Sequence, residues 1–343
     1  MDVDAQTMAR LNIQRLNISN QAKLCPLCGG DEHTVVGMRD RNGSALRTVM
    51  CATCGHVFTN PAPSEEDLKA YYTQHYRSEY KGVITPKRKH VLRAGLRALE
   101  RLSRLRTYVT KPSRVLDVGA GGGEFAYLLS CVGHTVTGIE PNAGYAEFAR
   151  QSYGLDIQAT TLELIEFETE NFDVITLHHV LEHVANPCDA LKKFWHWLKP
   201  GGVMIVEVPN AMSWFHAPRR RFHAAHLHTF NQLGLEDAFK AAGFHVENLQ
   251  VSAGTGHLNI VVRKELVRTT EPAFRYAAAD VLNHFQRHTE LAHILSGMAL
   301  TRLWGNALRP WRERKKLSDL GNPHDARDIL DRLFAPVLMP ALM

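Results

Sequence analysis

The sequence has 343 residues, of which 45% are hydrophobic and 22% charged, and a formal net charge of +5 with 19 histidines uncounted. This composition predicts an ordinary soluble protein with two or three structural units. No run approaches the roughly 18 apolar residues of a transmembrane helix. The first residues, MDVD, lack the basic and apolar regions of a signal peptide, so we expect a cytoplasmic protein. The small positive excess is compatible with anionic substrates or a membrane surface, but does not by itself indicate nucleic acid.

Residues 1–20 form a leader to which we assign no role. Two CxxC pairs follow, separated by 22 residues: Cys25, Cys28, Cys51 and Cys54. In a cytosolic chain such pairs favour a metal over disulfides. Four thiolates close a tetrahedral shell, so residues 21–60 are predicted to form a ribbon around a structural zinc ion, with two short strands between the pairs. We expect His33 and His56 to be surface histidines.

Residues 61–110 are predicted to form a helical linker and lid. Its tyrosine cluster has two interpretations, packing between ribbon and core or phenols carried into an active site, and Tyr76 is the catalytic candidate. From 87 to 106, apolar residues recur at helical spacing among Lys and Arg. We expect this basic helix to cover the core sheet, and contact with an anionic surface or substrate is the alternative.

The central pattern is D-x-G-x-G-x-G, in which Asp117 lies in a short buried strand that runs to Val118, and Gly119, Gly121 and Gly123 form a turn before a helix. Such glycines let backbone N–H groups approach a ligand closely. The next strand ends at Glu140, where a carboxylate can accept hydrogen bonds from ribose hydroxyls.

Further strands are predicted at 155–157, 172–179 and 202–210, with helices between them, and an antiparallel pair at 243–246 and 258–263 closes the sheet. This alternation predicts a parallel sheet with helices on both faces. A Rossmann dehydrogenase would share the glycine turn, but the later strands argue against it.

Residues 110–263 resemble the class I S-adenosylmethionine-dependent methyltransferases. The resemblance is carried by DVGAGGG at 117–123, GIEP at 138–141, FDVI at 172–175, HHVLEHV at 178–184 and LKPGG at 198–202. It implies an α/β fold with a doubly wound, mostly parallel seven-stranded sheet at 111–264, between the ribbon and a helical extension at 265–343. The ribbon with NPAP at 60–63, and HLHTF at 226–230, look like a bacterial group of zinc-ribbon methyltransferases that includes sugar-modifying and polysaccharide-cluster members. Ubiquinone-type O-methyltransferases are more distantly similar.

The resemblance also implies S-adenosylmethionine as the cofactor and assigns its contacts. Asp117 is assigned to the cofactor site, the glycines at 119, 121 and 123 would cradle the methionine moiety, and Glu140 would hold the ribose. Thr161 and Leu162, or the carboxylate of Glu163, would reach the adenine. His178 would line the same site.

Methyl transfer from a sulfonium is an in-line displacement, and an alcohol, phenol or carbon acid also needs a base. Histidine is suited to this near neutral pH. His178 and His179 end the fourth strand, and strand alternation should direct only one of them, His179, into the pocket. His226 and His228 are further candidates, whereas Glu182 and His183 are expected to open the next helix. The arginines at 219–221 either hold a phosphate or carboxylate or belong to a solvated loop.

The sequence thus predicts an S-adenosylmethionine-dependent methyltransferase acting on oxygen, or carbon, of a small-molecule or carbohydrate-linked acceptor, with an anionic acceptor as one option. An RNA methyltransferase that binds the strand with its ribbon and basic helix is an alternative, although nucleic acid is not favoured. A non-catalytic cofactor-binding scaffold is another. The helices at 265–343, with a basic aromatic segment at 309–316, have a membrane surface, a second subunit or the core as candidate partners.

Overall fold

The computed structural model describes residues 24–63, 86–265, 274–275 and 277–338. Among these residues, none of the helices combines the length and the apolar character needed to span a bilayer. Tyr76 and the rest of the tyrosine cluster lie outside the described residues, as does the leader.

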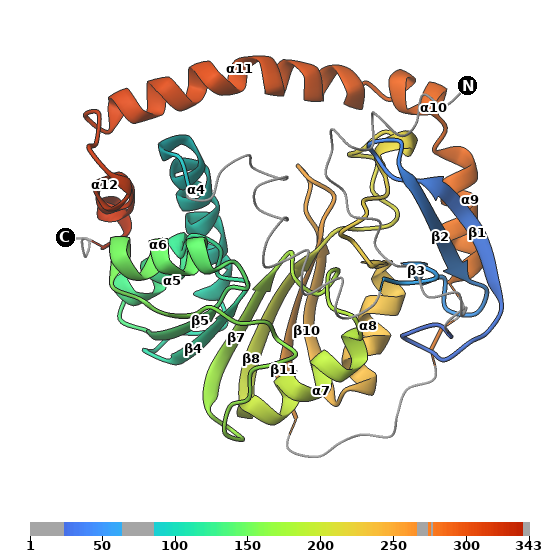
Figure 1. Ribbon diagram of the computed structural model, residues 1–343, viewed down its shortest axis with the longest axis horizontal. Coiled ribbons are helices and arrows are strands. Elements are labelled where there is room, and N and C mark those ends of the chain that lie inside the picture. Colours follow the sequence, from blue (N-terminus) through green and yellow to red (C-terminus); the bar gives the residue numbers. More distant parts are fainter. Residues whose placement is uncertain (1–23, 64–85, 266–273, 276, 339–343) are drawn as a thin grey trace.

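A seven-stranded sheet forms the centre of the molecule (Figure 1). Its spatial order is β10-β11-β8-β7-β4-β5-β6. Strands β4 to β8 run parallel, and β10 and β11 add an antiparallel edge, as the sequence predicts. The strands are β4 (Arg114–Val118), β5 (Thr135–Ile139), β6 (Asp156–Gln158), β7 (Phe172–His178), β8 (Leu198–Val208), β10 (Phe244–Val251) and β11 (Leu258–Lys264).

Helices cover both faces of this sheet, so its strands are buried on both sides. Val115 belongs to the hydrophobic core on one face and its neighbour Leu116 to the core on the other, which is the alternation expected of a strand. One face packs against α4 (Arg88–Leu105), α5 (Glu124–Cys131), α6 (Ala143–Tyr153) and α12 (Ala326–Leu338). The other packs against α7 (Pro187–Trp197) and α8 (Gln232–Ala241).

The ribbon has the two predicted strands and two more that sequence reasoning missed. Its sheet has the order β1-β2-β3-β9, with β1 (His33–Arg39), β2 (Ala45–Cys51), β3 (Val57–Thr59) and β9 (His228–Thr229). Strand β9 belongs to the insertion that follows β8 and pairs with β3 through Val57↔Thr229. The ribbon is therefore joined to the core by backbone hydrogen bonds.

The contact between β3 and β9, which we call the ribbon joint, buries His56, so the surface position expected for this residue is wrong. Its side chain is fully buried, stacks on Phe58, and places Nε2 3.1 Å from Nδ1 of His228. The ring is buried because the insertion, which the local sequence does not reveal as a partner, covers it.

The basic helix α4 covers the sheet as predicted, with Val91, Leu92 and Leu102 on its buried side. The C-terminal part begins with α9 (Ala278–Arg287) and α10 (Glu290–Leu295) near the ribbon. The long helix α11 (Met298–Asp319) then crosses to the opposite side of the molecule, where α12 packs against α4 (Figure 1).

We expect Phe334→Ala to destabilise the fold by about 3–5 kcal/mol, because this ring on α12 is fully buried in the core shared with α4 and α5. Urea unfolding of both proteins measures the difference. Leu164→Ala, at a side chain 60% exposed, is the matched control and should change stability by less than about 0.5 kcal/mol. Equal effects of the two substitutions would contradict the packing of α12.

Candidate functional site

A cavity of about 300 Å³ lies at the carboxyl edge of the parallel strands. The turn after β4 forms one wall, Glu140 after β5 another, and Thr161 to Glu163 after β6 a third. Because parallel strands end at the same edge, segments far apart in the sequence meet here. The cavity thus gathers the predicted residues Gly119, Gly121, Glu140, Thr161, Leu162 and His178.

Glu140 is held by the backbone on both sides. One carboxylate oxygen accepts the N–H of Gly121 at 2.9 Å, and the other accepts the N–H of Asn142 at 3.0 Å. Gly121 has a φ of 61°, a conformation that favours glycine. The carboxylate is therefore fixed against the glycine turn, and it can accept hydrogen bonds from vicinal hydroxyl groups, which is what a ribose requires.

The cavity contains a buried polar atom that a ligand could satisfy. Nε2 of His178 has no hydrogen-bond partner among the described residues. Burial lowers the pKa of His178 well below its ordinary value, so the ring is neutral. The same cavity walls contain the cationic side chain of Arg101, the carboxylate of Glu140 and the apolar side chain of Leu162. With the unpaired Nε2 of His178, this lining fits a nucleoside cofactor that carries an amino-acid group, such as S-adenosylmethionine.

Two predicted cofactor residues do not line this cavity. Asp117 is buried beneath it, accepts a hydrogen bond from Oγ1 of Thr176 at 2.7 Å, and has its pKa raised by burial to about 6. Gly123 is the N-cap of α5, where an added Cβ would lie 2.7 Å from Cβ of Ala149. Glycine is needed at 123 for helix packing, which the glycine motif does not distinguish from ligand contact.

His179 stands between this cavity and a second, larger one, since it lines both. It follows the last residue of β7 and has a φ of 59°, which is uncommon for a residue other than glycine. This change of backbone conformation ends the strand alternation. The expectation that only one of the pair His178 and His179 would reach the pocket is therefore wrong, because both line the smaller cavity.

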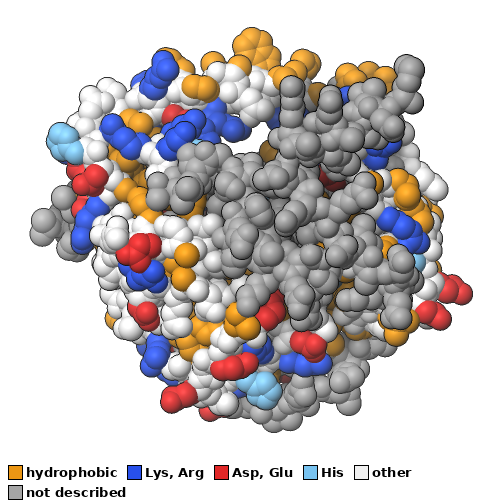
Figure 2. All heavy atoms as spheres, in the orientation of Figure 1, with side chains coloured by type: hydrophobic (Ala, Val, Ile, Leu, Met, Phe, Trp, Pro, Cys, Tyr) orange, Lys and Arg blue, Asp and Glu red, His pale blue; other side chains and the backbone are white. Residues whose placement is uncertain are grey.

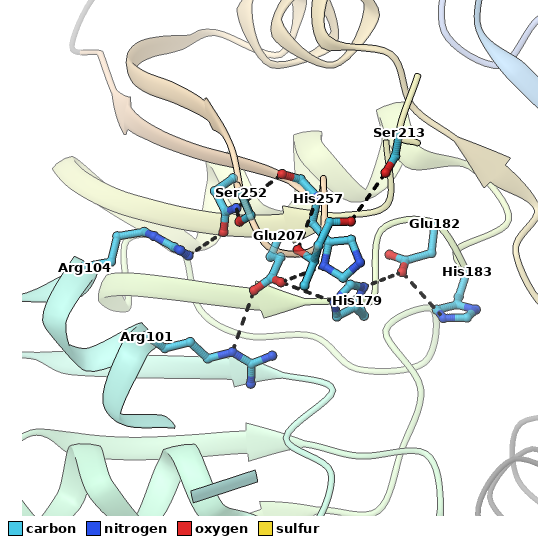
Figure 3. Close-up of polar contacts among 11 residues, drawn as sticks. Arg101, Arg104, His179, Glu182, His183, Glu207, Ser213, Ser252 and His257 are labelled. Atoms are coloured by element: carbon cyan, nitrogen blue, oxygen red, sulfur yellow. Dashed lines mark hydrogen bonds and ion pairs between the residues drawn. The ribbon is translucent and has the colours of Figure 1, made fainter. Parts of the chain in front are cut away.

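Two carboxylates flank His179, that of Glu182, which is buried, and that of Glu207, which is half-buried (Figure 3). Its Nδ1 lies 3.2 Å from Oε1 of Glu182, and its Nε2 lies 3.4 Å from Oε1 of Glu207. Burial alone would lower the pKa of His179, but the hydrogen bonds to these two carboxylates outweigh it and raise the pKa to about 9. At neutral pH His179 is therefore an imidazolium.

Glu207 also contacts His257 and Arg101. Nδ1 of His257 lies 3.0 Å from Oε1, and Nε of Arg101 lies 3.9 Å from Oε2 (Figure 3). Burial would raise the pKa of Glu207, but these neighbours and His179 hold it well below its usual range. Sequence reasoning missed both Glu207 and His257. A signal existed for Glu207, since it is the one acidic residue in the apolar run VMIVEV of β8.

The larger cavity has a volume of about 1030 Å³ and lies between the core, the insertion after β8 and helix α11. Arg220 and Arg221 of the predicted arginine cluster line it, whereas Arg219 does not. Nε of Arg219 instead lies 3.9 Å from a carboxylate oxygen of Glu290. The cavity shares Arg97, His179 and His183 with the smaller one, so a ligand in each could meet beside His179.

The remaining histidine candidates differ in position. His226 lines the larger cavity, and burial lowers its pKa well below the ordinary value. His228 is buried in the ribbon joint, with Nε2 3.0 Å from the carbonyl oxygen of Val184 and Nδ1 against His56. Both nitrogens of His228 are thus engaged away from the cavity. Glu182 and His183 precede α7 rather than open it, since the helix begins at Pro187.

The four cysteines of the ribbon converge. Sγ of Cys25 lies 3.6 Å from Sγ of Cys54, and Sγ of Cys28 lies 3.5 Å from Sγ of Cys51. A tetrahedron with Zn–S bonds of about 2.3 Å has edges near 3.8 Å, so this arrangement fits a zinc ion. Gly29 and Gly55, which follow the two pairs, have φ values of 74° and 69°, as the CxxC turns require.

Comparison with known proteins agrees with this geometry. Residues 88–249 match the family model described as a methyltransferase domain. The ubiquinone biosynthesis O-methyltransferase of Roseobacter denitrificans is 38% identical over 105 residues, which cover 29% of this chain and 42% of the relative. That of Pseudomonas entomophila is 36% identical over 103 residues, covering 28% and 44%. The chain therefore spans less than half the length of these curated relatives.

Solved structures of methyltransferases are also similar. An S-adenosylmethionine-dependent methyltransferase from Methanosarcina mazei matches with 18% identity and a TM-score of 0.43, over 48% of this chain and 97% of that one. A 1,6-didemethyltoxoflavin N1-methyltransferase from Burkholderia thailandensis matches with 21% identity and a TM-score of 0.43, over 58% and 86%. The family match, together with the observed sheet, confirms the predicted class I methyltransferase core.

We expect the stabilisation contributed by His179 to fade as the pH rises. Its pKa of about 9 lies above the value near 6.5 for an unfolded chain. The contribution is therefore complete below about pH 6.5 and is lost as the pH rises through about 9. Urea unfolding should show a free-energy difference between the native protein and His179→Gln that shrinks over this interval. A difference that grew with pH would contradict a protonated His179.

Proposed function

We propose, on the premise that residues 88–249 form a class I S-adenosylmethionine-dependent methyltransferase domain, that the protein transfers a methyl group to an oxygen of an anionic acceptor bound in the larger cavity. The observation that carries this proposal is the meeting of the two cavities at His179. In-line transfer needs donor and acceptor on either side of one short gap, and two adjoining cavities offer that arrangement.

In this proposal the smaller cavity holds the methyl donor. Glu140 would bind the ribose hydroxyls, Leu162 would pack on the adenine, and Arg101 would pair with the methionine carboxylate. S-adenosylmethionine, when bound, supplies a sulfonium methyl group that is already reactive. The chain's own task is then to align the acceptor and to remove its proton.

We assign the removal of that proton to His257, oriented by Glu207. With Nδ1 on the Glu207 carboxylate, His257 keeps Nε2 for an acceptor hydroxyl, and its side chain lines the larger cavity. His179, which the sequence favours as the base, already carries a proton at neutral pH. Its positive charge beside both cavities suits it to hold the acceptor oxygen rather than to deprotonate it.

The charge of the larger cavity supports an anionic acceptor. Nine Lys and Arg side chains line it, against the two acidic residues Glu182 and Glu313. Seven of the nine have no carboxylate partner among the described residues: Arg97, Arg220, Arg221, Arg302, Arg309, Arg312 and Lys316. Arginine forks bind phosphate and carboxylate groups well. A phosphorylated or acidic small-molecule or sugar-linked acceptor fits this lining.

The basic helix α4 gives less support to the RNA alternative. Nε of Arg101 is directed to Glu207, and Arg93 is ion-paired with Glu313 of α11. Arg97 is exposed and lines both cavities. Two of these three arginines are therefore ion-paired within the site, and the third lies at its opening.

We further propose that the ribbon holds one structural zinc ion. Mass spectrometry of the purified protein should then detect about one zinc per chain, and Cys51→Ser should lose it because a closed thiolate shell needs all four sulfurs. Cys131→Ser is the matched control, since Cys131 stands apart on α5, and it should retain the metal. Zinc content unaffected by Cys51→Ser would contradict the site.

Calorimetry with S-adenosylhomocysteine tests the cofactor site. Hydrogen bonds to a charged group contribute about 1.5–3 kcal/mol each, so Glu140→Ala should weaken binding about tenfold or more. Gly121→Arg should abolish binding by filling the cavity. Glu147→Ala, at an exposed carboxylate on α6, is the control and should bind as the native protein does. Unchanged binding by Glu140→Ala would refute the assignment.

Transfer itself is tested with methyl-labelled S-adenosylmethionine and an extract of cells that lack the gene. His257→Ala should reduce labelling about 100-fold while leaving S-adenosylhomocysteine binding intact, as expected for loss of a general base. His245→Ala, at an exposed histidine, should label normally. If the native protein bound the cofactor but labelled nothing, the non-catalytic scaffold would be favoured.

A further inference from the structure

Helix α11 has an uncovered apolar face. Four large side chains on it are exposed by 60% or more: Leu300 (61%), Leu303 (64%), Trp304 (66%) and Trp311 (60%). They recur at helical spacing, together with the less exposed Leu308, and so form one stripe along the helix. Isolated exposed apolar residues are ordinary, but a contiguous stripe with two tryptophans marks an interaction surface.

The opposite face of the same helix is polar and lines the larger cavity. Arg302, Arg309 and Lys316, each seven residues apart, lie on that face. None of the 22 residues of α11 is buried. Leu317, near the C-terminal end of α11, packs against the core. Because helices in proteins owe most of their stability to a packed apolar face, the rest of the apolar face of α11 lacks a packing partner among the described residues.

The charge pattern of α11 indicates what this partner is. The helix carries six Lys and Arg but only Glu313 and Asp319 as acids. Glu313 is already paired with Arg93 of α4. Arg314 and Lys315 are exposed where the apolar stripe ends. Apolar and tryptophan side chains flanked by uncompensated cations are typical of helices that lie in the interface of an anionic bilayer.

Figure 2 shows that apolar and cationic side chains occupy separate parts of the surface near α11. Apolar side chains lie along the upper edge, where Figure 1 places α11, and Lys and Arg side chains gather below them. Leu291, Ile294 and Leu295 of the neighbouring α10 are also exposed, by 59% or more, and enlarge the apolar surface at the start of α11.

We propose that α10 and α11 dock on an anionic lipid surface, with Leu303, Trp304 and Trp311 inserted at the headgroup level. A second copy of the chain is a weaker fit, because a two-fold contact through this stripe would bring the same cation-rich helix against itself. If the proposed function holds, the cationic cavity beneath α11 would lie next to the bilayer and could receive a lipid-anchored anionic acceptor. The docking itself does not depend on that function.

Cosedimentation of the full chain with vesicles tests the proposal. The native protein should bind phosphatidylcholine vesicles that contain about one third phosphatidylglycerol, and should bind pure phosphatidylcholine vesicles about tenfold less. Binding should weaken as salt is raised, because screening reduces the attraction of the cations. Leu303→Glu should lower binding to the anionic vesicles about tenfold or more.

The matched control is Met38→Glu, which places the same charge at a ribbon side chain that is 61% exposed, and it should bind as the native protein does. Leu303→Glu removes no buried contact, so its unfolding midpoint should match that of the native protein. S-adenosylhomocysteine binding should also persist in it, which separates this test from that of the proposed function.

Failure of the native protein to bind the anionic vesicles would overturn the proposal, as would equal binding by Leu303→Glu. A native dimer that Leu303→Glu dissociates, without vesicle binding by either protein, would identify a second copy as the occupant of the stripe and would equally contradict the docking.

Discussion

The site depends on one geometric constraint, the common edge at which five parallel strands end. Each strand delivers one part of the site there: β4 the glycine turn, β5 Glu140, β6 the segment at Thr161, β7 the histidine pair and β8 Glu207. The edge is rigid because the strands behind it are buried between two hydrophobic cores. Groups from neighbouring strand ends are in direct contact there: Glu140 accepts the N–H of Gly121, and Nε2 of His179 lies 3.4 Å from Oε1 of Glu207.

Glu207 links the two cavities electrostatically. Its half-buried carboxylate is costly to desolvate, and this cost is offset by Arg101 from α4, His179 from the end of β7 and His257 from the loop before β11. Arg101 reaches the smaller cavity and His257 the larger one. A change of charge in either cavity therefore alters the electrostatic surroundings of Glu207. Under the proposed function, Glu207 would couple cofactor binding to proton removal.

Features set by neighbouring residues could be predicted from the sequence, whereas contacts between distant segments could not. The glycine turn and Glu140 could be predicted, because strand, turn and acid lie in one short stretch with the spacing expected for a single ligand. The sheet could be predicted from the alternation of strands and helices. The pairing of β9 with β3 could not, because nothing in two short strands 170 residues apart indicates that they pair. For the same reason His56 and His228 were expected on a surface or in the pocket, and both are buried in the joint. His257 was missed because a lone histidine in a loop gains its chemistry only from Glu207.

The central claim, that the methyl donor binds at the carboxyl edge with its reactive group beside His179, is tested most directly by a crystal structure of the protein with S-adenosylhomocysteine. The account predicts that the ribose hydroxyls contact the Glu140 carboxylate, and that the sulfur faces the boundary between the two cavities near His179. A ligand seated in the larger cavity, or one whose sulfur points away from that boundary, would contradict it.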